Sequence, residues 1–280
     1  MSFNSSNDSI PYTNLSDLAG IPKIDVAGSS VVGRYNDIIL TFGGIGLNNS
    51  YGYQLIYTFD TKNSTWNSLT TNGIQPPIRK GVRPVFTYGR LYAFGGFDNT
   101  AGKYYNSLDM LDSIGFVWSN ITLLDGPSGR DGYVSALLSD GNILYLGGYA
   151  GPTTALDTVY LYNTNNNSWQ NVSTVGTVPE GRGYFTSVLS ENNQGYSHFA
   201  TPTLVVLDLS SFTWISQIVT GDSTPPPLLL HTANVVNNYM ILAYAAVVST
   251  ALLIYGLTAC YNMLKVKGYF SNFIATPGTK

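Results

Sequence analysis

Short apolar runs recur along the chain, and three of them end at two adjacent glycines. Residues 39–44 read ILTFGG, residues 91–96 read LYAFGG and residues 143–148 read ILYLGG, so each diglycine follows the previous one by 52 residues. A segment that recurs at a spacing near fifty residues indicates a tandem structural unit, because each unit must stack on its neighbours to bury its apolar faces. The pattern therefore predicts a repeat protein.

Two further markers share the period of the diglycines. A tryptophan follows the second glycine by 21 or 22 residues, and a fourth tryptophan continues the series: Trp66, Trp118, Trp169 and Trp214. The phrase Pro-x-x-Arg precedes the last three tryptophans: Pro76 and Arg79, Pro127 and Arg130, Pro179 and Arg182. One unit then runs from Pro-x-x-Arg through two strands to the diglycine, and on through a third strand and a turn to the tryptophan.

Each unit contains four runs of strand length, shown most clearly by residues 134–138, 142–146, 158–162 and the run around Trp169. These runs are apolar on both faces, which is typical of a sheet packed between two others. Residues 60–63 and 163–166 are rich in Asp, Asn and Thr and are predicted hairpin turns. Four strands per unit is the composition of a propeller blade.

The diglycines and tryptophans are interpreted as structural. The glycines Gly43, Gly44, Gly95, Gly96, Gly147 and Gly148 end a strand where the chain must turn and pass close to other backbone. A phosphate-binding loop is the alternative, but neither GxxxxGK nor GxGxxG follows. Each tryptophan is expected to fill the space between adjacent sheets by packing against the next one, with ligand stacking as the alternative.

Diglycine, tryptophan and a period near fifty together resemble the kelch repeat, from about Gly28 to Trp214. The resemblance implies an all-β, kelch-type β-propeller of the galactose-oxidase central-domain type, whose members are mostly protein-interaction modules and occasionally enzymes. Four blades are recognisable where six or seven are usual in the family, so an incomplete propeller is expected. The predicted organisation is a polar segment at 1–20, the propeller at 21–236, a segment at 239–264 with two interpretations, and a polar tail at 265–280.

Two stretches depart from the repeat. Residues 190–199 read SENNQGYSHF where an apolar strand and a diglycine should stand, so the fourth blade is expected to lack its second strand. Residues 239–264 carry no charge and are followed by Lys265 and Lys267, which predicts a transmembrane helix with a cytoplasmic C-terminus. Ala245 and Ala246 stand at the place of the glycines, so a degenerate fifth blade is the alternative.

Composition and charge exclude several classes of protein. Charged residues make up 10% of the chain, whose net charge is −3, and there is no basic block, so nucleic acid is not an expected partner. Cys260 is the single cysteine, which excludes an intrachain disulfide. The N-terminal residues as they stand do not resemble a secretory signal peptide.

Asparagine sequons nevertheless recur in the repeats and are candidate glycosylation sites: Asn48, Asn63, Asn120, Asn166 and Asn171. Together with the membrane segment they lead us to expect a membrane protein with its propeller on the extracytoplasmic side. A soluble cytoplasmic protein is the alternative.

Candidate chemistry is sparse. The galactose-oxidase comparison calls for two His, two Tyr and a Cys linked to one Tyr around copper, whereas this chain has only His198, His231 and Cys260, without motif spacing. There is no GxSxG motif and no pair of carboxylates with a recognisable spacing. We therefore expect no catalytic residues, no metal and no cofactor; a degraded or truncated galactose-oxidase-like oxidoreductase is the alternative.

The arginines of the Pro-x-x-Arg phrase are the candidate binding residues. A residue that recurs once per blade faces the same way relative to the propeller axis, so Arg79, Arg130 and Arg182, continued by His231, are predicted to form an arc. The resemblance to kelch-type propellers implies that this arc lies at the channel mouth and is a binding surface, which would suit a carboxylate-bearing partner. The alternative is that each arginine satisfies backbone carbonyls between blades. The sequence thus predicts a non-enzymatic module that binds a protein or a glycan, is held at a membrane by residues 239–264, and self-associates at an open blade edge.

Overall fold

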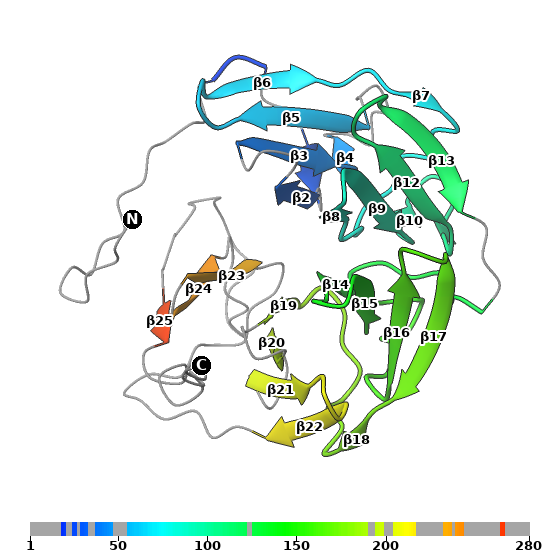
Figure 1. Ribbon diagram of the computed structural model, residues 1–280, viewed down its shortest axis with the longest axis vertical. Coiled ribbons are helices and arrows are strands. Elements are labelled where there is room, and N and C mark those ends of the chain that lie inside the picture. The colour runs from blue at the N-terminus through cyan, green and yellow to red at the C-terminus, as the bar shows by residue number, and fades with distance from the viewer. Residues whose placement is uncertain are drawn as a thin grey trace, which may run out of the picture.

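The computed structural model describes residues 18–20, 24–26, 29–32, 37–46, 55–121, 125–189, 194–198, 204–216, 232–236, 239–243 and 264–266. Every regular element within these residues is a strand, so the prediction of an all-β protein is confirmed. Figure 1 shows five sheets that follow one another in chain order around a common centre, from the blue first sheet to the orange fifth sheet. This arrangement is that of a β-propeller.

The first four sheets each contain four antiparallel strands in chain order, from the innermost to the outermost. The first consists of β2 (Ser29–Val32), β3 (Ile38–Phe42), β5 (Ile56–Asp60) and β6 (Thr65–Ser68). The second consists of β8 (Val85–Thr87), β9 (Arg90–Phe94), β12 (Leu108–Asp112) and β13 (Val117–Ile121). The third consists of β14 (Val134–Leu137), β15 (Asn142–Leu146), β16 (Thr158–Asn163) and β17 (Ser168–Ser173). The fourth consists of β19 (Thr186–Leu189), β20 (Gln194–His198), β21 (Leu204–Asp208) and β22 (Thr213–Ser216).

The remaining strands are short or belong to the fifth sheet. The fifth sheet contains β23 (Thr232–Val236), β24 (Tyr239–Ala243) and β25 (Leu264–Val266). Two small antiparallel pairs join β1 (Ile24–Val26) to β4 (Ile45–Gly46) and β10 (Phe97–Asp98) to β11 (Lys103–Tyr104), and the second pair is a hairpin.

Short parallel strands link neighbouring sheets at the outer rim. After leaving the first sheet the chain forms β7 (Asn72–Gly73), which pairs with β13 of the second sheet, and β18 (Val175–Gly176) pairs in the same way with β22 of the fourth. Gly73 and Gly176 have positive φ angles of 82° and 84°. This conformation suits glycine, because a side chain there is strained. The chain leaving one blade thus extends the sheet of the next.

The hydrophobic core lies between the sheets. One cluster joins Leu40 and Phe42 of the first sheet to Leu91 and Trp118 of the second, and two more clusters join the second sheet to the third and the third to the fourth. Both faces of a middle sheet are therefore buried, which explains why its strands do not alternate between apolar and polar residues.

The tryptophans pack between sheets, but in the direction opposite to the prediction. The rings of Trp118 and Phe42 are 5.7 Å apart, and those of Trp169 and Phe94 are 5.6 Å apart. Trp214 donates its Nε1–H to the carbonyl of Leu156, at 3.0 Å. In all three cases the partner belongs to the preceding blade.

The fourth sheet does contain a second strand. The polar stretch at 190–199 was expected to have lost it, yet β20 pairs with β19 on one side and β21 on the other. A strand that is hydrogen-bonded on both sides satisfies its backbone groups, and this does not require an apolar sequence. The expectation of a three-stranded fourth blade was wrong.

The predicted membrane helix over residues 239–264 is not supported. Its first five residues form β24, which pairs with β23, and Leu264 lies in β25, which pairs with the other edge of β24. Within the described part of the chain no helix is long and apolar enough to cross a membrane. Residues 244–263 lie outside the described residues. The pairing at the two ends of the segment agrees with the alternative prediction of a fifth blade.

Candidate partner-binding face

The strand order places the repeated motifs at one end of the propeller. The second strand of each of the first three blades runs from a tight turn at one end to the diglycine at the other, where the Pro-x-x-Arg segment also enters the next blade. We call this end the motif face. The turn between β8 and β9, which contains Tyr88, lies at the opposite end.

Each diglycine contacts the arginine segment of the following blade. The N–H groups of Gly44, Gly96 and Gly148 donate to the carbonyls of Arg79, Arg130 and Arg182, at 3.2, 2.8 and 2.9 Å. A Cβ on the preceding glycine would lie 2.5 to 2.9 Å from the same carbonyl oxygens, closer than a side chain can approach; this holds for Gly43, Gly95 and Gly147. The glycines also have positive φ angles. Their position is that of structural links between blades.

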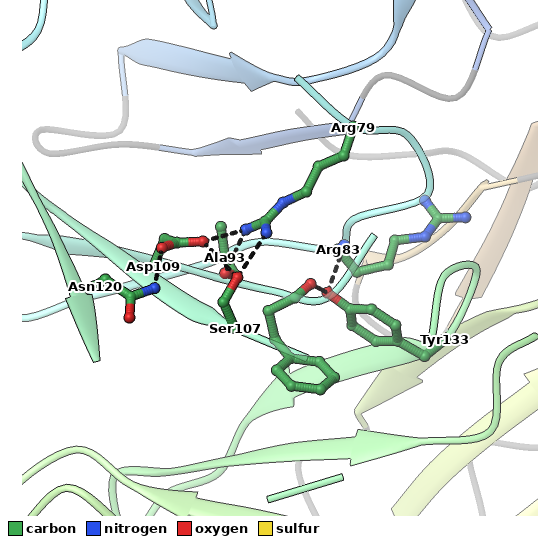
Figure 2. A network of polar contacts seen from close by, with 8 residues as sticks. Arg79, Arg83, Ala93, Ser107, Asp109, Asn120 and Tyr133 are labelled. Carbon is green, nitrogen blue, oxygen red and sulfur yellow. Dashed lines mark hydrogen bonds and ion pairs between the residues drawn. The ribbon is translucent and has the colours of Figure 1, made fainter. Parts of the chain in front are cut away.

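Arg79 lies at the centre of a buried polar network (Figure 2). Its side chain is buried, and Nη2 lies 2.5 Å from Oδ2 of Asp109 and 3.2 Å from the carbonyl oxygen of Ala93. Nη1 donates to the hydroxyl of Ser107 at 2.9 Å, and Asn120 donates its amide to the second oxygen of Asp109 at 2.7 Å. The guanidinium thus binds groups of its own sheet and is not presented to solvent.

The other two arginines are also buried but have different partners. Arg130 donates to the carbonyls of Gly147 and Ser128 at 3.2 and 3.0 Å, and its guanidinium lies 5.1 Å from the ring centre of Tyr160. Within the described residues Arg182 donates from Nε alone, to the carbonyl of Glu180 at 3.3 Å. Burial lowers the pKa of both guanidinium groups. His231, the predicted fourth member of the arc, lies outside the described residues.

These contacts can be compared with the two interpretations of the repeated arginines, which were a binding arc and structural contacts with backbone carbonyls. The three arginines are only 1 to 3% exposed, and their contacts with carbonyl oxygens are those that the structural alternative describes. A partner on the motif face therefore does not reach the guanidinium groups without a movement of the covering residues.

Aromatic residues that are half-buried, or in the case of Tyr149 exposed, occupy the motif face instead. The hairpin of β10 and β11 carries Phe97 and Tyr104, whose ring centres are 4.5 Å apart, and Tyr149 of the third blade lies 6.1 Å from Tyr104. Two lysines cover aromatic rings: Lys80 Nζ lies 5.3 Å from the centre of Phe97, and Lys103 Nζ lies 5.0 Å from that of Tyr105. We call Lys80, Phe97, Lys103, Tyr104, Tyr105 and Tyr149 the aromatic–lysine patch.

Backbone and side-chain contacts hold this patch on a rigid support. Asp131 and Tyr149 exchange two backbone hydrogen bonds at 3.0 and 2.8 Å, and Lys80 and Phe97 exchange two at 3.0 Å. Tyr184 of the next blade donates its hydroxyl to the Asp131 carboxyl. Burial raises the pKa of Asp131, although the bond from Tyr184 acts in the opposite direction. Sequence reasoning missed the patch; the signal that could have found it is the YY pair with Lys103 in a loop that follows a diglycine.

The candidate metal ligands do not form a recognisable site. No group of three or more His, Cys, Asp or Glu side chains lies close enough to hold a metal within the residues described by the structure. His198 is part of β20, while Cys260, like His231, falls outside the described residues.

The sequons occupy different environments. The side chains of three sequon residues are exposed: Asn63, Asn166 and Asn171. Asn63 lies in the turn between β5 and β6, and Asn166 lies in the turn between β16 and β17. Asn120 donates its amide nitrogen, the atom to which a glycan would be attached, to Asp109. Asn48 lies outside the described residues.

Comparison with known proteins identifies a family of repeat domains to which this chain is similar. The KLHDC2/KLHL20/DRC7 Kelch-repeats domain model matches residues 15–198. Kelch domain-containing protein 3 of Homo sapiens is 25% identical over 171 residues, covering 58% of this chain and 44% of the relative. Acyl-CoA-binding domain-containing protein 5 of Arabidopsis thaliana is 26% identical over 209 residues, covering 72% and 31%. Kelch domain-containing protein 1 of Mus musculus is 23% identical over 215 residues, covering 65% and 52%. The chain thus spans about half the length of these relatives or less.

Proposed function

The chain belongs to the kelch-repeat family, and we propose that it is a non-enzymatic protein-binding module whose partner docks on the aromatic–lysine patch. The observation that supports this most directly is the composition of the patch. Its four aromatic residues and two lysines stand together on one face, and Tyr149 is 36% exposed. Tyrosine offers a large, rigid contact area with a polar tip, and aromatic residues are enriched at the centres of protein interfaces.

The support beneath the patch favours the same function. Loops that are tied to neighbouring blades by backbone hydrogen bonds present their side chains in a fixed arrangement, so less conformational freedom is lost when a partner binds. The two lysines lie over aromatic rings while their charged ends stay available to an acidic group of the partner.

The proposal is tested by measuring partner affinity. Proteins captured with the full chain are identified, and the dissociation constant of a purified partner is measured by calorimetry for the wild type, Tyr149→Ala and Lys103→Ala. We expect Tyr149→Ala to weaken binding about tenfold or more, as for a residue near an interface centre. Tyr88→Ala is the matched control, since Tyr88 is 79% exposed at the opposite end.

Several outcomes would speak against this function. If Tyr88→Ala weakens binding and Tyr149→Ala does not, the partner uses the opposite face. A glycan that binds in place of any protein would support the second ligand class predicted from the sequence. Stoichiometric bound copper in the purified chain would support the alternative of an oxidoreductase.

An extracytoplasmic location is a separate proposal, supported by the exposure of Asn63, Asn166 and Asn171. Secretion from eukaryotic cells followed by N-glycosidase treatment tests it: a mass loss that disappears in Asn→Gln variants of these residues is expected, and an unmodified secreted protein would refute it. Membrane attachment through residues 239–264 is not included, because the segment begins with a paired strand.

A further inference from the structure

Among the residues that the structure describes, Arg182 differs from the other repeated arginines in having two unpaired terminal nitrogens. Arg182 is 3% exposed, and neither Nη1 nor Nη2 has a hydrogen-bond partner within this part of the chain. In Arg79 both terminal nitrogens are paired, and in Arg130 they donate to Gly147 and Ser128.

The missing partner can be located by comparing the blades. Asp109, Tyr160 and Val205 occupy the same position of the third strand, because each stands two residues before the residue paired with the blade's tryptophan: Leu111 with Trp118, Tyr162 with Trp169 and Leu207 with Trp214. Asp109 binds Arg79, and the Tyr160 ring lies beside Arg130. In the fourth blade this position holds an apolar valine, which offers the guanidinium neither charge nor hydrogen-bond acceptor.

No carboxylate of the described residues forms an ion pair with Arg182, although the charge of Glu180 raises the pKa of its guanidinium against the larger, opposite effect of burial. Glu180 accepts from Nε through its backbone carbonyl, but its side chain is exposed and forms no ion pair with Arg182. Arginine stays protonated in proteins, so it cannot lose its charge as a buried lysine can. A buried charge that lacks a partner is strongly destabilising, so a bound anion would be stabilising here.

We propose that Arg182 binds a small carboxylate from solution, which supplies the counter-charge that Asp109 supplies to Arg79. The second blade supplies the chemistry, since there a carboxylate oxygen lies 2.5 Å from the arginine. A planar carboxylate matches the two parallel N–H groups of a guanidinium. The ligand must be small, because Arg182 is too deeply buried for a side chain of a protein partner to reach it. The site would join the third blade to the fourth, since the carbonyl of Arg182 already accepts from Gly148.

The test uses formate as the probe and the full chain as the protein. Thermal unfolding is followed while formate replaces chloride at constant ionic strength, and binding is observed directly by line broadening of 13C-formate. A ligand that binds only the folded state raises the unfolding midpoint, by about 2 to 5 °C when its concentration is about ten times its dissociation constant. We expect this rise, together with broadening of the formate signal, for the wild type.

Four variants separate this site from general salt effects. Arg182→Met should lose both the rise and the broadening, while Arg130→Met should keep them. Val205→Asp should supply the missing carboxylate within the chain, so formate should neither bind nor raise the midpoint. Glu180→Gln should respond as the wild type does. Formate binding and thermal stability are measured separately. If one variant folds poorly, the remaining variants therefore still decide the question.

The proposal is overturned if the wild type neither binds formate nor changes its midpoint, or if Arg182→Met responds as the wild type does. It is also overturned if only Glu180→Gln gains the response, because Glu180 would then be the counter-charge in solution. None of these results tests the proposed partner-binding face, which is tested separately by the substitutions of Tyr149 and Lys103.

Discussion

Replacing Asp109 by alanine is expected to destabilise the second blade more than most single substitutions do. Arg79 and Asp109 are 1% and 2% exposed, and the substitution removes the carboxylate that lies 2.5 Å from Nη2. The guanidinium then keeps the Ala93 carbonyl, the Ser107 hydroxyl and the ring of Tyr105, none of which carries a negative charge. Leaving one charge of a buried pair uncompensated costs about 3 to 5 kcal/mol. This is a large share of the roughly 5 to 15 kcal/mol that holds a typical domain together.

The loss is measured by urea unfolding at pH 7, followed by the fluorescence of the buried tryptophans. Arg79→Met should cost a similar amount, because it leaves Asp109 buried with only its polar neighbours. The double variant Arg79→Met with Asp109→Leu should cost less than the sum of the two single variants, because neither charge remains. Coupling between residues in direct contact is typically about 0.5 to 3 kcal/mol.

Two results would refute this reasoning. A loss below about 1 kcal/mol for Asp109→Ala would place the pair among weak surface ion pairs, against its burial. Additive losses in the double variant would mean that the two side chains stabilise the blade independently, for example through their packing.

Three further outcomes are expected. Gly95→Ala should lower the free energy of unfolding by about 1 kcal/mol or more in addition to the loss caused by Gly102→Ala. Both glycines have positive φ, but only at Gly95 would the added Cβ lie 2.5 Å from a carbonyl oxygen; equal losses in urea unfolding would contradict this. Trp214→Phe should cost about 1 kcal/mol more than Trp118→Phe, because Trp214 Nε1 donates to Leu156 while Trp118 Nε1 has no partner in the described part of the chain; the reverse order in thermal unfolding would argue against it. Asp131→Asn should stabilise the protein at pH 7 and lose this advantage as the pH falls, because burial raises the pKa of Asp131 and its protonated form is favoured in the folded state; a pH-independent difference in unfolding free energy would be inconsistent.

The repeat and its fold class follow from the sequence alone. Glycines at a period of 52 residues, tryptophans in register with them and turns rich in Asp and Asn are local requirements, because tight turns and strand ends restrict which residues fit. The turn prediction at residues 60–63 corresponds to a turn in which Asp60 accepts hydrogen bonds from the N–H groups of Lys62 and Asn63. Such local patterns can be recognised without knowing which distant residues become neighbours in the fold.

The aromatic–lysine patch was not predicted, because its members come from different blades. Tyr149 and Tyr104 become neighbours only when the third blade is placed beside the second. Strand identity also depended on context: the polar β20 is held by pairing on both sides, and the apolar start of residues 239–264 is a strand although its composition suits a helix. Short apolar runs are compatible with both structures until their pairing is known.

The repeated arginines show most clearly which features the sequence specifies and which depend on the tertiary structure. Their spacing, visible in the sequence, places them at equivalent points of successive blades, since a repeat must return to the same position relative to the axis. The group beside each arginine is set by a residue 23 to 30 positions away: Asp109, Tyr160 or Val205. Only the tertiary structure brings each arginine to its third strand, so it alone decides whether the charge is paired, stacked on a ring or left without a counter-charge. The free energy of a buried charge depends on its immediate neighbours, and periodicity does not specify them.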